Sequence, residues 1–272
     1  MDPQPYSYSF GETDAERTEA NLRYLEEVIT YEGPDQIAAM FIETVTGTNG
    51  VLIPPEGYLK GLRALLDRYG ILLVCDEVMA GFGRTGKMFA FEHGDILPDI
   101  VTMAKGLTSS HLPLGAMGMR QSIADHFKSH VFLGGLTYNS HPAALAAAEA
   151  SIRVLLDEGM VDNAARLEAV MHEEMSRLVD THPSVKTYRA IGLFGMIDLQ
   201  SDASGTPLAP YNHYSPVGSA FKKRLMELGL YTYVRWSEFM CLPPLCITEE
   251  ELRRGFAIIS EGLAVVDEAF QT

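Results

Sequence analysis

Two hydrophobic patterns alternate along the first half of the chain. One is the amphipathic pattern of a helix, as in residues 13–30, where Leu22, Leu25 and Ile29 fall on one side. The other is a short continuous apolar run, as in residues 71–75, which is typical of a strand covered on both faces of a parallel sheet. The alternation of strands and helices predicts an α/β fold with a mostly parallel sheet. The expected strands are residues 37–42, 71–75, 99–104 and 114–119, and the expected helices are residues 13–30 and 57–69.

The second half of the chain changes its pattern after an Ala-rich helix at residues 141–156. A charged amphipathic helix comes next, followed by pairs of neighbouring strand-like runs. We therefore expect two domains, a partial large domain over residues 1–156 and a small C-terminal α+β domain over residues 157–272. The small domain is expected to contain helices at residues 161–179, 215–228 and 249–270, and strands at residues 185–190, 193–199, 231–234 and 239–242.

Composition excludes several classes of partner. The chain has 272 residues with 21 Lys and Arg against 36 Asp and Glu, and its net charge of -15 disfavours nucleic acid and anionic membranes. Three cysteines are too few for a disulfide framework, and no apolar run approaches membrane-spanning length. No basic and then apolar leader opens the chain, so the expected compartment is the cytoplasm. Four histidines show no metal-ligand spacing with one another: His93, His111, His130 and His141.

Two charged residues stand where two of the expected strands end. Asp76 follows the run at residues 71–75, and Lys105 follows the run at residues 99–104. In open α/β sheets, ligands gather at the carboxyl ends of the strands. Either residue taken alone is most often only the first solvated residue of a loop. Taken together, a buried acid and a lysine at two strand ends indicate a site that traps a carbonyl group.

Pyridoxal phosphate is the cofactor whose chemistry suits such a pair. An amine that attacks a carbonyl must lose its proton, and burial favours this loss by lowering the pKa of a lysine. A carboxylate beside a pyridine nitrogen keeps that nitrogen protonated, and the ring then acts as an electron sink. Enzymes that use pyridoxal phosphate carry a Lys and an Asp in this arrangement.

The sequence around the pair forms a longer signature. It includes the glycine-rich run Gly81-Phe82-Gly83-Arg84-Thr85-Gly86 and resembles the signature of the class III (omega-amino acid) aminotransferases of fold type I. Further blocks resemble this family on both sides and occur in the family's order. The matching blocks are residues 42–55, 76–86, 98–100, 104–107, 113–116, 136–142 and 242–248.

The resemblance implies a role for each of five residues. Lys105 is implied as the lysine that forms the internal aldimine with pyridoxal phosphate and later moves the substrate's proton. Asp76 is implied to pair with the pyridinium nitrogen, and Val78 to pack on one face of the ring. Thr137 is implied to bind the cofactor phosphate in the site of a neighbouring subunit, which implies a homodimer. Arg235 is implied to hold the substrate carboxylate through a two-pronged contact.

The chain departs from the family at two places. Ser110 stands where the family usually carries Gly, and a left-handed backbone there would strain a residue with a side chain. Members of the family are also considerably longer. Their N-terminal part supplies a phosphate-binding helix start and an aromatic residue that stacks on the ring, and residues 1–42 of this chain resemble neither. The chain therefore resembles the C-terminal part of an aminotransferase.

The sequence thus predicts a transaminase that moves an amino group from an omega-amino acid or related amine to an oxo acid such as pyruvate. Two alternatives remain at this stage. An aminomutase or a decarboxylase of the same family would keep Asp76 and Lys105 and change only the pocket. A truncated fragment without catalytic activity would also carry both residues.

Overall fold

The structure is a computed structural model that describes residues 11–271. Residues 1–10, where the sequence shows no phosphate-binding motif, lie outside the described residues. The chain divides into two compact units. The first unit is Met1–Gly83 with Lys87–Gly159, and the second is Arg84–Gly86 with Met160–Thr272.

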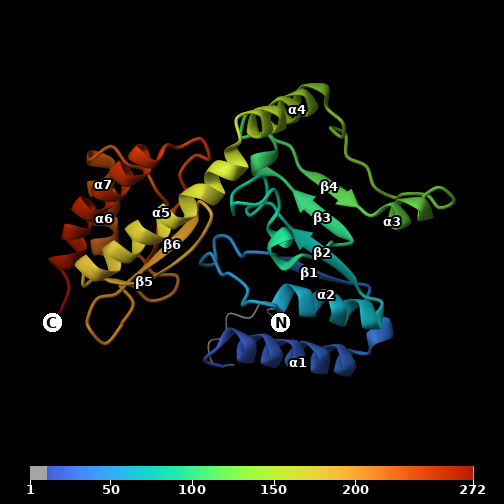
Figure 1. The fold of residues 1–272 in the computed structure, drawn as a ribbon, viewed down its shortest axis with the longest axis horizontal. Helices are drawn as coiled ribbons and strands as arrows, with labels where there is room; N and C mark the ends of the chain where they lie inside the picture. The colour runs from blue at the N-terminus through green and yellow to red at the C-terminus, as the bar shows by residue number, and fades with distance from the viewer. Residues whose placement is uncertain (1–10, 272) are drawn as a thin grey trace. The chain divides into compact units, whose positions relative to one another are not determined.

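A four-stranded sheet forms the centre of the first unit (Figure 1). Its strands, in spatial order, are β1 (Ala39–Glu43), β2 (Leu72–Asp76), β3 (Ile100–Met103) and β4 (Ala116–Met119). The first three strands run parallel, whereas β4 pairs with β3 in the antiparallel direction. The mostly parallel sheet expected from the sequence is therefore confirmed, with β4 as its antiparallel edge.

Two helices of the first unit pack in succession against this sheet, α2 (Tyr58–Tyr69) directly and α1 (Asp14–Glu32) behind it (Figure 1). A capping box at Thr13 begins α1, and α2 ends at Gly70, whose φ of 67° suits a residue without a side chain. The apolar stripes of both helices and the inner residues of the strands form one core. Its fully buried members include Tyr58, Leu62, Leu66, Leu73 and Cys75.

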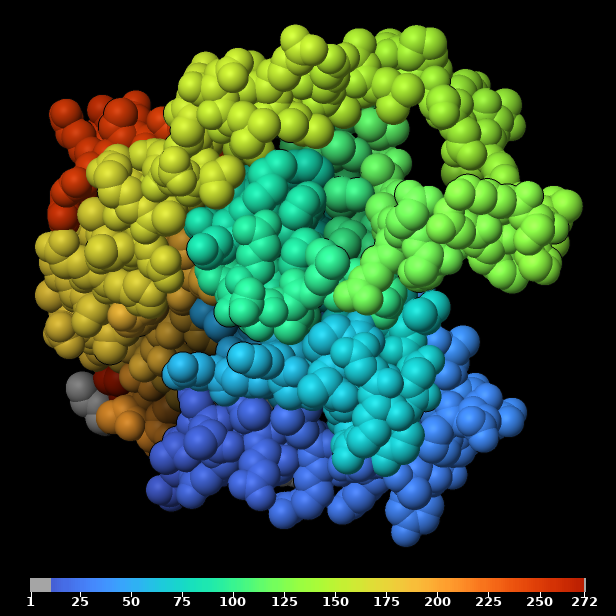
Figure 2. Space-filling view, turned by 45° about the vertical axis from the view of Figure 1, so that its right-hand side comes forward, coloured from blue at the N-terminus to red at the C-terminus, as the bar shows by residue number. Residues whose placement is uncertain are grey.

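The segment between β4 and the helix α4 (Pro142–Asp157) stands away from the rest of its unit (Figures 1 and 2). It contains a short helix, α3 (Gln121–His126), which the sequence analysis did not predict. Three short 3₁₀ turns connect other elements: η2 (Pro34–Gln36), η3 (Ala90–Gly94) and η4 (Lys105–Leu107).

The second unit is an antiparallel sheet packed on helices. In spatial order its strands are β5 (Val185–Ile191), β6 (Phe194–Leu199), β8 (Glu238–Cys241) and β7 (Val234–Arg235). The helices are α5 (Met160–Thr181), α6 (Pro216–Glu227) and α7 (Glu249–Asp267). The α+β pattern expected for this part is confirmed. The strand expected at residues 231–234 is wrong in extent, because the ladder with β8 includes only Val234 and Arg235.

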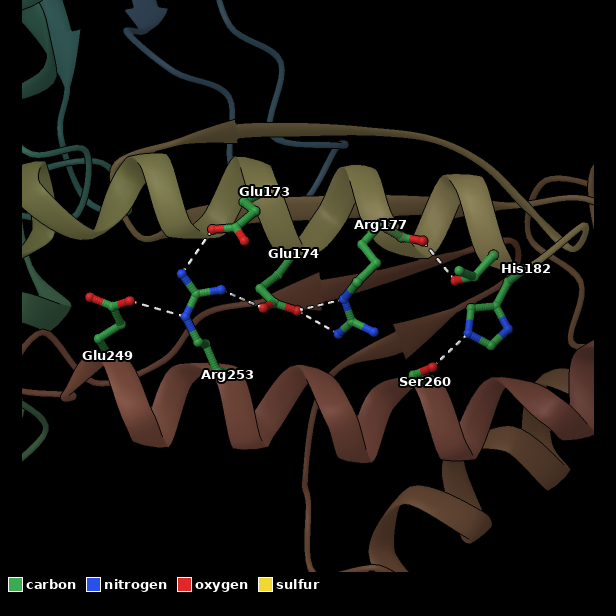
Figure 3. A network of polar contacts seen from close by, with 8 residues as sticks. Glu173, Glu174, Arg177, His182, Glu249, Arg253 and Ser260 are labelled. Atoms are coloured by element: carbon green, nitrogen blue, oxygen red, sulfur yellow. Dashed lines mark hydrogen bonds and ion pairs between the residues drawn. The ribbon is translucent and has the colours of Figure 1, made fainter.

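A polar network joins α5 to α7 along the surface of the helical layer (Figure 3). Arg253 on α7 donates hydrogen bonds to Glu173 and Glu174 on α5, each at 2.8 Å, and to Glu249 at 3.0 Å. Nε2 of His182, just after α5, lies 2.8 Å from the hydroxyl oxygen of Ser260 on α7. Because Arg253 is more than one third exposed, the network contributes less to stability than the apolar core beneath it. Among the described residues, no helix is both long and apolar enough to cross a membrane.

Candidate functional site

Asp76 and Lys105 lie at the carboxyl ends of two adjacent parallel strands. Asp76 is the last residue of β2 and pairs in register with Thr102 of β3. Lys105 lies three residues after Thr102 in the chain, just beyond the end of β3, and begins η4. The sheet thus presents the carboxylate and the amine at the edge where ligands of α/β sheets bind.

The loop that follows Asp76 fixes its side chain. The backbone amide of Val78 donates a hydrogen bond to Oδ1 of Asp76 at 2.9 Å. This bond uses one carboxylate oxygen and holds Val78, the proposed ring-packing residue, directly beside the acid. The sequence predicts a buried acid here, whereas Asp76 is half-buried in the structure. A half-buried carboxylate remains reachable by a ligand.

Glu77, next to Asp76, anchors the same loop from inside. Its carboxylate accepts hydrogen bonds from the Thr44 hydroxyl at 2.8 Å and from the amides of Ala90 and Phe91, each at 2.9 Å. Glu77 is fully buried, and burial raises the pKa of its carboxyl above the usual range, although these three donors act in the opposite direction. Glu77 therefore ties the end of β2 to β1 and η3, and its oxygens are occupied by structural contacts.

The backbone around Lys105 is held in an uncommon conformation. Lys105 is exposed and has a φ of 45°, which is rare for a residue with a side chain. The following Gly106 lies so close to Phe82 that an added Cβ would stand 3.0 Å from the Phe82 Cβ. Thr108 is buried, and its hydroxyl donates to the Leu112 carbonyl at 2.7 Å. The loop is therefore packed beneath Lys105 and supports its left-handed conformation.

The left-handed conformation expected at Ser110 is present. Ser110 has a φ of 66° and its neighbour Ser109 a φ of 46°. The Ser109 hydroxyl lies 2.9 Å from that of Ser151 on α4. This loop holds two strained serines where a glycine would adopt the same backbone at lower cost.

Thr137 lies on the segment between β4 and α4 and is exposed. It begins a turn that is closed by a hydrogen bond from the Asn139 amide to the Leu136 carbonyl at 3.0 Å. Within the part of the chain that the structure describes, no hydrogen bond joins Thr137 to Asp76 or Lys105. Thr137 is thus accessible from outside its own unit, as the expected contact with the cofactor phosphate of a neighbouring subunit requires.

Arg235 belongs to the second unit, where it ends β7 beside a two-residue turn. Its guanidinium carbon lies 3.6 Å from the centroid of the Trp236 ring, and the ring of Tyr211 lies 4.4 Å from that of Trp236. Trp236 has a φ of 51°, which the tight turn between β7 and β8 imposes. Stacking on the indole ring fixes the plane of the Arg235 guanidinium.

The structure also gives a role to Arg84, which the glycine-rich motif left open. The Arg84 side chain donates from Nη1 to the carbonyl of Leu193 at 2.9 Å and to that of Pro243 at 2.7 Å. Burial lowers its pKa to about 10. Gly192 packs so closely on this segment that an added Cβ would stand 2.4 Å from the Thr85 carbonyl carbon. Arg84 is thus a structural residue of the second unit. Its partners could not be found from the sequence, because they lie far from it along the chain.

Comparison with known proteins identifies a family. The family model described as "Aminotransferase class-III" matches residues 3–263. "Gamma aminobutyrate transaminase 1, mitochondrial" of Solanum lycopersicum is 33% identical over 261 residues, which is 93% of this chain and 50% of that protein. The chain thus spans about half the length of the curated relatives that it matches.

Two solved structures share the fold. Taurine:2-oxoglutarate aminotransferase from Bifidobacterium kashiwanohense, in complex with PLP and glutamate, superposes with a TM-score of 0.93 at 40% identity and covers 100% of this chain and 61% of its own. An (S)-enantioselective omega-transaminase from Thermomicrobium roseum superposes with a TM-score of 0.85 at 36% identity, over 97% of this chain and 58% of its own. The α/β fold class expected from the sequence is confirmed by these matches.

Proposed function

The chain belongs to the class III aminotransferases, and from this premise we propose that it carries the lysine-bearing part of a transaminase site. The proposed reaction moves an amino group from an omega-amino acid or related amine to an oxo acid such as pyruvate, with pyridoxal 5'-phosphate as cofactor. One observation carries the proposal: Asp76 ends β2, and Lys105 lies just beyond the end of the adjacent parallel strand β3, at the edge of the sheet where a ligand can meet both.

The residues at this edge fit pyridoxal phosphate. When bound, this cofactor supplies an aldehyde that condenses with amines and a ring that accepts electrons. Oδ1 of Asp76 accepts the Val78 amide, so Oδ2 is the atom that would hold a proton on the ring nitrogen. The Val78 side chain, half-buried beside it, would pack on one face of the ring. Lys105 would carry the substrate's proton on Nζ, and the Thr137 hydroxyl would donate to the cofactor phosphate.

On the substrate side, we propose that Arg235 binds the acid group of the amino donor. The supporting observation is its stacked guanidinium, which presents a planar pair of donors. The names of two relatives, gamma-aminobutyrate transaminase and taurine:2-oxoglutarate aminotransferase, refer to donors with an acid group at the end opposite the amine. These names favour the omega-amino acid class, and the second name makes 2-oxoglutarate the acceptor to test beside pyruvate.

We further propose that the chain acts as a homodimer in the cytoplasm. Thr137 lies exposed on a projecting segment, which supports its use by a second subunit. The cysteines Cys75, Cys241 and Cys246 are free, which suits a reducing compartment. The reaction products distinguish a transaminase from a same-family aminomutase or decarboxylase. A fragment without catalytic activity would form no product.

The experiment combines a spectrum with product analysis. Pyridoxal phosphate is added to the purified chain, and the visible absorption is followed as taurine, gamma-aminobutyrate or beta-alanine is added with pyruvate or 2-oxoglutarate. A transaminase shifts the band and converts pyruvate to alanine or 2-oxoglutarate to glutamate. Release of carbon dioxide would identify a decarboxylase, rearrangement of the donor a mutase, and the absence of any band a fragment that does not bind the cofactor.

A further inference from the structure

Two histidine side chains stack on one another at the end of α3, in the segment that stands away from the rest of its unit (Figure 1). His126 is the last residue of α3, and His130 follows it by four residues, in the turn after the helix. Their ring centroids lie 3.9 Å apart, with an angle of 5° between the ring planes. Both residues are exposed. The two imidazoles therefore form a pair that a small ligand can approach from solvent.

Hydrogen bonds fix the tautomer of the neutral His130 ring. Nδ1 of His130 lies 3.0 Å from the carbonyl oxygen of His126, which can only accept, so Nδ1 carries the proton and donates it. The Ser129 hydroxyl lies 3.1 Å from the same nitrogen and donates to the same carbonyl at 3.4 Å. The unprotonated nitrogen of His130 is therefore Nε2. A histidine that binds a metal adopts this arrangement, with one ring nitrogen donating to a carbonyl and the other presenting a lone pair.

The His126 ring can supply the second lone pair. Among the residues that the structure describes, its ring contacts are the stack on His130 and an edge contact with Phe127, whose centroid lies 5.3 Å away. A metal ion bound to two imidazole nitrogens, at about 2.0–2.1 Å from each, requires these nitrogens to lie at most about 4 Å apart. The stack holds the rings at about that spacing. Small rotations of the exposed side chains can turn both lone pairs toward one ion.

The surroundings of the pair supply no third ligand. Asp125 precedes His126, and its Oδ1 already accepts from the Gln121 amide at 2.8 Å and lies 2.7 Å from Nζ of Lys128. Within residues 11–271, no group of three or more His, Cys, Asp or Glu side chains is arranged to hold a metal ion. The coordination that the pair can offer therefore consists of two imidazoles, with water in the remaining positions.

We propose that His126 and His130 together bind one divalent transition-metal ion of the class of Zn²⁺ and Cu²⁺. Imidazole nitrogen suits these ions, whereas Mg²⁺ and Ca²⁺ prefer oxygen ligands. The net charge of -15 raises the local concentration of cations around the chain. The bound ion links the last turn of α3 to the turn that follows it. Neither histidine has a part in the proposed transamination, so the metal site and that function stand or fall separately.

Calorimetric titration of the full chain with Zn²⁺ tests the pair. The protein carries no affinity tag, and pyridoxal phosphate is left out because its phosphate can bind Zn²⁺. The unchanged chain should bind one ion at this site. His126→Ala and His130→Ala should each weaken the binding by about tenfold or more, because the loss of a mere outer-shell partner of a metal ligand already costs about 10–100-fold. Mg²⁺ at the same concentrations should not bind.

His213 offers a matched control. It is exposed, and its Nδ1 lies 2.9 Å from the carbonyl oxygen of Tyr211, as that of His130 does from a carbonyl, but its loop contains no second histidine. His213→Ala should leave the dissociation constant for Zn²⁺ unchanged. All variants are made in a Cys246→Ser background, because the exposed Cys246 thiol is a competing ligand for Zn²⁺. Electron paramagnetic resonance of bound Cu²⁺ should show two nitrogen ligands in this background and one in each variant of the pair.

Three results would overturn the proposed site. One is an equal dissociation constant for Zn²⁺ in the background protein, His126→Ala and His130→Ala. Another is weaker binding in only one of these two variants, since the ion would then have a single histidine ligand. The third is equal binding of Zn²⁺ and Mg²⁺, which would reflect the negative charge of the chain alone. Because both histidines are exposed, the variants should fold like the unchanged protein, as circular dichroism can verify.

Discussion

At the scale of single residues, the candidate site depends on how Asp76 is held. Its carboxylate is fixed through one oxygen by the Val78 amide, in a loop that Glu77 anchors from the interior. The other oxygen is the atom proposed to keep a ring nitrogen protonated. The charge of Asp76 is therefore expected to matter for chemistry much more than for folding.

Replacing this charge gives the first prediction. Asp76→Asn should still bind pyridoxal phosphate, because the shape of the side chain is kept. It should lose most of the proton-transfer rate, by about a hundredfold or more, since that is the usual size of general acid-base and electrostatic contributions. The rate is measured as donor-dependent change of the cofactor spectrum under single turnover. Asp95→Asn, an exposed acid in the loop after η3, is the matched control and should leave the rate unchanged. An unchanged rate in Asp76→Asn would show that Asp76 has no part in the chemistry and is only a loop residue.

At the scale of secondary structure, Glu77 joins three elements of the first unit. Its carboxylate satisfies two amides of η3 and the hydroxyl of Thr44 after β1, while its own backbone follows the end of β2. All of these contacts are buried. Loss of the carboxylate would leave two backbone donors without a partner in the interior.

The second prediction follows from this junction. Glu77→Ala should lower the free energy of unfolding by about 2–5 kcal/mol, because each unsatisfied buried donor costs about 1–3 kcal/mol. Urea denaturation followed by circular dichroism measures the change. Glu27→Ala on the exposed face of α1 is the control and should change the free energy by less than about 0.5 kcal/mol. A similar small change in Glu77→Ala would mean that other groups or water take over its hydrogen bonds.

Most elements could be predicted from the sequence because their signals are local. Periodicity located α1, α2 and α5, and the continuous apolar run located β2. The strand ends that carry Asp76 and Lys105 follow from the same signal. The six-residue helix α3 was missed because it is too short to show a period.

Contacts between distant parts of the chain could not be predicted in this way. Arg84 lies 109 and 159 residues from the two carbonyls that it binds. The pairing of Glu238 with both Asp198 and Arg235 depends on the order of strands in the sheet, which periodicity does not contain. The short extent of β7 is likewise set by its pairing with β8 and not by its own residues.

At the scale of the whole molecule, exposed apolar residues gather on the segment between β4 and α4. Leu133 is 95% exposed, and its neighbours are exposed as well. Such a concentration of apolar side chains is characteristic of a surface that contacts another protein. The exposed members are Val131, Phe132, Leu133, Leu136 and Tyr138.

The third prediction is that the chain associates through this segment. Burial of these side chains should drive association even against the net charge of -15. Size-exclusion chromatography with light scattering should show a dimer or larger species, and Leu133→Asn with Leu136→Asn should shift it toward the monomer. Lys128→Asn, a polar change just after α3 in the same segment, should not cause this shift. A clean monomer of the unchanged chain would contradict both the association and the shared role of Thr137.

The central claim is that Lys105 is the residue to which the cofactor attaches. The most direct measurement is reduction of the chain with borohydride in the presence of pyridoxal phosphate, followed by mass spectrometry of the peptides. We predict that the reduced cofactor is found on the peptide that contains Lys105. Lys105→Ala should lose the covalent cofactor while keeping its fold, and Lys87→Ala, which removes another exposed lysine, should retain it. Covalent cofactor on a different lysine of the unchanged chain, or trapping that persists in Lys105→Ala, would contradict the account.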